Sequence, residues 1–190
     1  MLLLLALALF AVLTFVWPAL RLKRRTGQWG LVSHRGADPC QRLVGTLMGL
    51  WMLAVTAWST AFALLGRAPL GIWAAPSWLS RLGLGLLAAG LLLVVAAQAQ
   101  MGASWRIGID DRPTPLVTGG IFRFSRNPIF AGMLLALLGV VAITPSAASL
   151  VGWLAMAQLI FVQVRLEEQH LLRLHGDSYD QYLRRVRRFF

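Results

Sequence analysis

The chain has 190 residues, of which 58% are hydrophobic, and its 18 lysines and arginines against seven acidic residues give a formal net charge of +11. Four long stretches carry no charge: residues 1–20, 43–66, 82–102 and 127–163. A helix that crosses a bilayer core needs about 20 predominantly apolar residues. The composition therefore excludes an ordinary soluble domain and predicts an all-α integral membrane protein. The single cysteine, Cys40, excludes an intrachain disulfide.

The first three uncharged runs predict three N-terminal transmembrane helices. We expect the first helix over residues 1–20, with its end near Trp17-Pro18, the second over 43–66 and the third over 81–101. Small residues permit close helix packing in membranes. The third helix has three candidate positions for such packing, which are Gly83, Gly85 and Gly90.

The fourth uncharged run is long enough for two helices joined by a tight turn at residues 144–146. One helix is expected to begin at Pro128, because proline lacks the N–H that would go unpaired in a first helical turn. The side chain of Ser125 or Asn127 is expected to cap it. The other helix is expected over residues 147–166. The chain is thus predicted to contain about five transmembrane helices.

The fifth helix is expected to continue through Glu167 and Glu168 to Gly176, a residue typical of helix ends. A short last helix then begins at Asp177. Tyrosines and apolar residues recur in it at three- and four-residue spacing, which indicates an amphipathic helix lying on the membrane surface. The arginines within residues 184–188 are expected to contact lipid headgroups.

The positive charges predict the orientation of the chain in its membrane. Of the 18 lysines and arginines, 16 are expected on the side of the membrane that holds the C-terminus. Only Arg67 and Arg81, around the connection between the second and third helices, are expected on the other side. Cytoplasmic loops carry an excess of positive charge, so we expect a multi-pass protein with its N-terminus outside and its C-terminus in the cytoplasm. A bacterial chain of this kind would reside in the plasma (inner) membrane. The positive charges follow the first apolar run, which favours a retained helix over a cleaved signal peptide. Membrane lipids explain the basic charge better than nucleic acid does.

Two polar clusters are expected to meet where the fourth helix begins and the fifth ends. One lies within residues 119–132 and the other within residues 165–170. Free N–H groups at a helix start suit a carboxylate, and Glu167 and Glu168 suit an ammonium or sulfonium group. A zwitterionic cofactor would fit between them. Alternatively, Arg126 or Arg165 pairs with Glu167 or Glu168 and simply locks the hairpin. The residues alone leave both possibilities open.

The same residues resemble a known family. Residues 116–132 (LVTGGIFRFSRNPIFAG) look like the C-terminal signature of the isoprenylcysteine carboxyl methyltransferases and related phospholipid methyltransferases, and so do Glu167-Glu168 with the residues that follow them up to Tyr182. The resemblance covers about residues 100–190. It implies about five helices and S-adenosylmethionine bound in a cytoplasmic pocket beside a tunnel for a lipophilic substrate. Residues 1–190 then form a single membrane domain, with three helices in 1–101 and the cofactor-binding region in 102–190.

The resemblance also implies a set of site residues. The residues expected to bind the cofactor are Thr114, Leu116, Val117, Gly120, Phe122, Arg126, Asn127, Pro128, Ile129, Phe130 and Glu167. Glu168 and Arg165 are the expected catalytic residues, with Arg165 as the nearest substitute for a substrate-contacting arginine of the family that falls near Gln163. The family commonly has histidine where this chain has Asn127. No metal site is expected, because the three histidines are scattered along the chain.

The predicted reaction is direct transfer of a methyl group to a lipid or small hydrophobic acceptor, in which the enzyme mainly supplies alignment. The acceptor atom could belong to a carboxylate, thiol, amine or phenol. An amine or phenol needs a base, for which Glu168 and His170 are the candidates. Two other functions are open: an NADPH-dependent membrane reductase of the sterol-reductase type, and a non-catalytic membrane scaffold. The sequence makes no prediction about the oligomeric state.

Overall fold

The computed structural model describes residues 1–27, 39–105 and 115–190. Every regular element among these residues is a helix, which confirms the predicted all-α membrane class. Four helical segments are long and apolar enough to cross a bilayer: Leu2–Arg24, Pro39–Leu65 (α3), Ser77–Met101 (α4) and Ala147–His175 (α6). A further apolar helix, α5 (Pro128–Ile143), has only 16 residues. It is about 24 Å long, which is shorter than a bilayer core of about 30 Å.

The first transmembrane segment is longer than predicted. α1 (Leu2–Ala11), the π-helical turn η1 (Val12–Val16) and α2 (Trp17–Thr26) follow one another without a break. The segment ends at Gly27, whose φ of +71° is the left-handed conformation that commonly terminates helices. The basic residues that were expected to follow the first helix therefore lie on its last turns.

The prediction that this helix ends near Trp17-Pro18 is wrong, because the structure accommodates the proline. Pro18 lies in the first turn of α2, directly after the π-helical turn. A proline inside a helix leaves the carbonyl four residues earlier without its usual N–H donor. Here that carbonyl belongs to Thr14, and it accepts a 2.8 Å hydrogen bond from Nε2 of Gln98 on α4. A side chain from a neighbouring helix thus satisfies the freed backbone group, as the bilayer requires.

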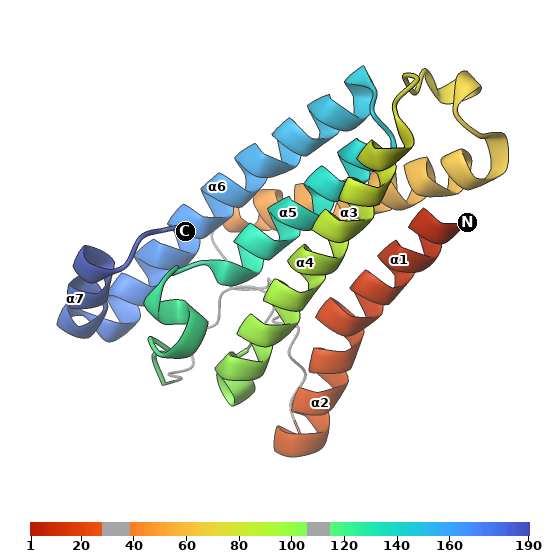
Figure 1. Ribbon diagram of the computed structural model, residues 1–190. Coiled ribbons are helices and arrows are strands. Elements are labelled where there is room, and N and C mark those ends of the chain that lie inside the picture. Colours follow the sequence, from red (N-terminus) through yellow and green to blue (C-terminus); the bar gives the residue numbers. More distant parts are fainter. Residues whose placement is uncertain (28–38, 106–114) are drawn as a thin grey trace.

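Figure 1 shows that the α1–α2 segment, α4, α5 and α6 are inclined in a similar direction, while α3 crosses behind them. α3 begins one turn earlier than the predicted residue 43. It contacts α6 through Trp51, whose Nε1 donates a 2.9 Å hydrogen bond to the Gly152 carbonyl. Many leucines of these helices are exposed, as expected for surfaces that face lipid.

α4 and α5 are in backbone contact at two pairs of glycines. Gly83 faces Gly139, and Gly90 faces Gly132. A Cβ atom added to Gly83 would lie 2.6 Å from the Gly139 carbonyl oxygen, and one added to Gly132 would lie 2.8 Å from the Gly90 carbonyl oxygen. No side chain fits at such distances. The close packing predicted for Gly83 and Gly90 is therefore confirmed, whereas Gly85 faces open space.

These pairs set the register of two antiparallel helices of unequal length. In this register the start of α5, at Pro128, lies beside residue 94 of α4. α4 ends at Met101, so it continues for about two turns, or about 10 Å, past the start of α5. The space beside those two turns of α4 is where the candidate site lies.

The hairpin of α5 and α6 has its turn at residues 144–146, as predicted. Ser146 caps α6: its Oγ accepts a 3.1 Å hydrogen bond from the Ser149 backbone N–H. α6 continues to His175 and ends at Gly176, also as predicted. At the other end of the hairpin, Pro128 begins α5 as expected. No side chain caps α5 in the predicted way. Instead, Oγ of Ser125 accepts a hydrogen bond from the Asn127 backbone N–H at 3.2 Å.

The last helix, α7 (Asp177–Arg185), packs against the protein. Tyr179 is 2% exposed and Tyr182 is 8% exposed. The hydroxyl of Tyr182 donates a 2.6 Å hydrogen bond to the Phe122 carbonyl. The predicted short amphipathic helix is confirmed, but its tyrosines pack against the protein and not against the membrane. The predicted orientation of the chain in the membrane stays a prediction.

Candidate functional site

A cavity of about 410 Å³ lies at the end of the helix bundle where α4 extends beyond α5. This volume is in the range of small-molecule sites in proteins. Its lining comes from α3, α4, α6, α7, the first turn of α5 and the segment before it. Nine of the predicted cofactor-binding residues line it: Leu116, Val117, Phe122, Arg126, Asn127, Pro128, Ile129, Phe130 and Glu167. Thr114 lies outside the described residues, and Gly120 does not line the cavity.

Gly120 instead shapes the segment that leads into the site. It begins the short helical turn η5 (Gly120–Arg123) with a φ of +58°, which favours glycine. A Cβ atom at this position would collide with the side-chain amide of Gln100. That amide accepts a 2.8 Å hydrogen bond from the Ile121 backbone N–H. Gly120, predicted to bind the cofactor, thus packs closely against Gln100 of α4.

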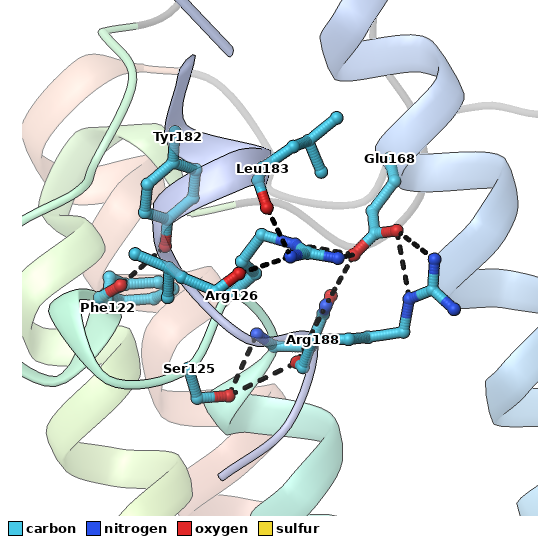
Figure 2. Close-up of polar contacts among 9 residues, drawn as sticks. Phe122, Ser125, Arg126, Glu168, Tyr182, Leu183 and Arg188 are labelled. Atoms are coloured by element: carbon cyan, nitrogen blue, oxygen red, sulfur yellow. Dashed lines mark hydrogen bonds and ion pairs between the residues drawn. The ribbon is translucent and has the colours of Figure 1, made fainter. Parts of the chain in front are cut away.

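Glu168 lies at the centre of a buried ionic cluster at the start of α5 (Figure 2). Its Oε1 accepts hydrogen bonds from Nε of Arg126 at 3.0 Å and from Nδ2 of Asn127 at 3.2 Å, and Nη2 of Arg126 is 2.9 Å away. Its Oε2 accepts from Nε and Nη2 of Arg188, at 3.0 and 2.7 Å. The hydrogen bond to Glu168 raises the pKa of Arg188 further above its usual value. Both carboxylate oxygens are therefore fully engaged.

The same cluster anchors the C-terminal tail. Nη1 of Arg126 donates to the carbonyls of Leu183, at 3.1 Å, and of Val186. The Arg126 backbone N–H donates to the Arg187 carbonyl at 2.9 Å, and Oγ of Ser125 donates to the Arg188 carbonyl at 3.3 Å. The arginines within residues 184–188 were expected at the lipid headgroups, and the sequence carried no signal for this contact. A buried glutamate indicates that a cation lies near it, but the sequence does not identify which of the 18 lysines and arginines that is.

The two adjacent glutamates have different surroundings. Glu168 does not line the cavity, and its pairing with Arg126 matches the structural alternative that the sequence left open. Glu167 does line the cavity, where its Oε1 accepts a 2.8 Å hydrogen bond from Nε2 of Gln163. Arg165 is exposed and does not line the cavity. The predicted catalytic pair is therefore not brought together at the cavity.

The candidate bases are also away from the cavity. Glu168 has no free carboxylate oxygen, and His170 is buried outside the lining. The two tyrosines of α7 do line the cavity. Burial raises the pKa of Tyr182 to about 12 and that of Tyr179 still further, so both phenols are neutral at physiological pH. Neither neutral phenol acts as a base, and the hydroxyl of Tyr182 already donates its proton to the Phe122 carbonyl.

The cavity lining also has a large apolar part that is rich in methionine. Every methionine of the chain except the first lines the cavity: Met48, Met52, Met101, Met133 and Met156. Methionine side chains are flexible and adapt to irregular shapes. Two buried glutamines share this lining, Gln41 and Gln98, and each has an amide atom without a hydrogen-bond partner. Such a group costs about 1–3 kcal/mol. The cavity therefore joins an ionisable wall to an apolar wall.

Known proteins resemble this chain in sequence. A family model described as phospholipid methyltransferase matches residues 78–178. The chain is 34% identical over 80 residues to methanethiol S-methyltransferase 1 of Bradyrhizobium diazoefficiens, covering 42% of this chain and 27% of that protein. It is 30% identical over 107 residues to the protein-S-isoprenylcysteine O-methyltransferase of Schizosaccharomyces pombe, covering 54% and 45%. The chain thus spans less than half the length of either relative.

A solved structure has a similar fold. It is the eukaryotic intramembrane Ras methyltransferase, an isoprenylcysteine carboxyl methyltransferase, with a TM-score of 0.63 and 20% sequence identity. The match covers 95% of this chain and 62% of that one, so the N-terminal helices share the fold as well. The family match covers more than half of this chain and includes residues 116–132 and both glutamates. The chain belongs to the phospholipid methyltransferase family, which confirms the resemblance predicted from its C-terminal residues.

Proposed function

We propose that this chain is an S-adenosylmethionine-dependent methyltransferase that acts on a lipophilic acceptor at the cytoplasmic face of its membrane. One observation carries the proposal: a single cavity is lined by a carboxylate, by the start of a helix and by methionine-rich apolar surface. A cofactor with charged ends suits the polar lining, and an acceptor taken from the bilayer suits the apolar lining.

The described residues fit the charged parts of the cofactor. The first N–H groups of a helix have no intrahelical partner, and those of Ile129 and Phe130 lie in the cavity wall at the start of α5. They suit the carboxylate end of the cofactor. Glu167 suits its amino end, because it lines the cavity and Gln163 is its one side-chain hydrogen-bond partner among the described residues.

The remaining predicted residues form the sides of the cofactor pocket. Leu116, Val117 and Phe122 provide apolar surface for the adenosine portion. Thr114, outside the described residues, belongs to the same proposed set. Glu168, Arg126 and Arg188 do not react in this scheme. They fix the start of α5 and the C-terminal tail, and so position the wall that holds the cofactor.

When bound, S-adenosylmethionine would supply a methyl group activated by a sulfonium, which is transferred directly to the acceptor while the sulfur leaves as a thioether. The chain then has to align the acceptor and exclude water, and such alignment alone can lower a barrier by about 7–11 kcal/mol. The relatives named above act on methanethiol and on isoprenylcysteine. Methanethiol and the isoprenyl group are both apolar, in keeping with the methionine-rich lining.

Ligand binding to the purified protein tests the proposal. We expect saturable binding of S-adenosylhomocysteine, the product of the cofactor, and none of NADPH. Glu167→Gln should weaken S-adenosylhomocysteine binding by about 10- to 100-fold, because hydrogen bonds to charged groups contribute about 1.5–3 kcal/mol, while the protein stays folded. Asp180→Asn is the matched control, since Asp180 pairs with Arg184 on α7, outside the cavity lining.

Three results would contradict this proposal. Saturable binding of NADPH alone would support the membrane reductase. Binding of neither ligand would support the scaffold. An unchanged affinity in folded Glu167→Gln would mean that the cofactor lies elsewhere.

A further inference from the structure

The cavity lining contains two buried amides, each with one atom that has no hydrogen-bond partner among the described residues. Gln98 is 8% exposed and Gln41 is 6% exposed. Nε2 of Gln98 donates to the Thr14 carbonyl at 2.8 Å, and its Oε1 is the unpaired atom. In Gln41 the unpaired atom is Nε2. Buried polar atoms in proteins are nearly always paired, so two orphaned amide atoms in one cavity lining point to a ligand that pairs with them.

The free end of the Gln98 amide is defined by its contact with Thr14. A carbonyl only accepts hydrogen bonds, so the NH₂ group of Gln98 must face it and the oxygen is left over. An oxygen of this kind selects a donor, such as the O–H or S–H of a ligand. Gln41 provides the complementary donor. A hydroxyl or thiol has the chemistry to pair with either amide, because it donates and accepts.

Among the described lining residues, the basic side chains that an anionic acceptor could meet are those of Arg126 and His175. Arg126 is the only arginine or lysine among the described lining residues. Its Nε and Nη2 face Glu168, and its Nη1 donates to two carbonyls of the tail. In the described lining, no arginine or lysine is therefore left to neutralise a carboxylate. The methionines around the glutamines instead suit an uncharged body of variable shape.

These observations carry the proposed function one step further, and the inference rests on it. The geometry points to an uncharged apolar acceptor that carries a hydroxyl or thiol, held through that group by Gln98 and Gln41 within the methionine-rich wall. The site would then discriminate against acceptors whose polar group is a carboxylate.

Equilibrium binding of three probes to the protein saturated with S-adenosylhomocysteine tests this inference without relying on turnover. The probes are 4-octylphenol, its methyl ether 4-octylanisole, and 4-octylbenzoate. We expect the phenol to bind about tenfold more tightly than the ether, because only the phenol donates a hydrogen bond. The benzoate should bind more weakly than the phenol.

Variants assign the preference to the two amides. Gln98→Met and Gln41→Met should each reduce the preference for phenol over ether to less than about threefold. Gln41→Met is the cleaner variant, since Gln41 makes no hydrogen bond in the described structure, whereas Gln98→Met also removes the bond to Thr14. Gln158→Met is the matched control, because Gln158 is exposed on α6 and lies outside the cavity lining. It should keep the full preference.

Three results would overturn the inference: equal binding of phenol and ether to the unaltered protein, a preference that survives in both variants, or tighter binding of the benzoate. Failure of S-adenosylhomocysteine to bind would be seen separately, before any probe is added, and would contradict the proposed function instead.

Discussion

Replacing Glu168 with glutamine should release the C-terminal tail from the start of α5. The substitution keeps the shape of the side chain but removes the charge shared by Arg126 and Arg188. The side chains of Glu168 and Arg126 are only 7% and 9% exposed, so Arg126 would keep a buried charge without its counterion. Breaking a buried pair in this way costs about 3–5 kcal/mol. Arg188 adds less, since its side chain is 38% exposed.

Two measurements on the detergent-solubilised protein check this prediction. A loss of 3–5 kcal/mol corresponds to a fall in melting temperature of about 6–20 °C for a chain of this length. Trypsin should also cleave the tail faster, at arginines within residues 184–188, because residues 183–188 are held by contacts to Ser125, Arg126 and Asn127. Mass spectrometry of the products locates the cut.

The control is the same substitution one residue earlier. Glu167→Gln removes a carboxylate that faces the cavity and does not bind the tail, so melting temperature and cleavage rate should stay close to those of the unaltered protein. The reasoning is refuted if Glu168→Gln melts and is cleaved like the unaltered protein. It is equally refuted if Glu167→Gln has the same effect, because the cluster would then not be specific to Glu168.

Two further substitutions test the packing and the last helix. Gly90→Leu should lower stability by at least about 3 kcal/mol in a melting experiment, since a Cβ atom there collides with the Gly132 carbonyl. Gly85 faces open space, so Gly85→Leu should have little effect. Similar losses of stability in both variants would contradict the glycine contact. Tyr182→Phe should lower stability by about 1 kcal/mol below pH 10 through loss of the hydrogen bond to Phe122. Burial raises the pKa of Tyr182 from 10 in the unfolded chain to about 12, so this advantage is present below pH 10 and is lost as the pH rises through 12. A stability difference that stays constant from pH 8 to pH 12 would be inconsistent with that pKa.

The parts of the fold that sequence reasoning predicted are those that local rules control. Uncharged runs of about 20 residues indicate helices because the bilayer leaves the backbone no other partner. Pro128 marks the start of α5 because its missing N–H costs nothing there. The turn at residues 144–146 follows from one apolar run that is too long for a single span.

The errors arose where a distant residue decides the outcome. The helix continues through Pro18 because Gln98, 84 residues away in the chain, pairs with the Thr14 carbonyl. The different surroundings of Glu167 and Glu168 depend on the rotation of α6, since neighbours on a helix point about 100° apart. Only the packed structure fixes that rotation. The attachment of Arg188 to Glu168 likewise requires the tail to fold back past α7, which no periodicity indicates.

The unequal lengths of α4 and α5 explain why the polar and apolar parts of the cavity meet. The glycine pairs hold the two helices in a register that leaves the last two turns of α4 without α5 beside them. Gln98 and Met101 of α4 lie in that space, and the start of α5 presents its N–H groups and Asn127 to the same space. α5 is about 24 Å long, which is shorter than a bilayer core of about 30 Å. Buried charges at this end of α5 have to be paired, and Glu168 forms ion pairs with Arg126 and Arg188. A longer α5 would fill this space and separate the two kinds of ligand, so the length of one helix makes the proposed reaction possible.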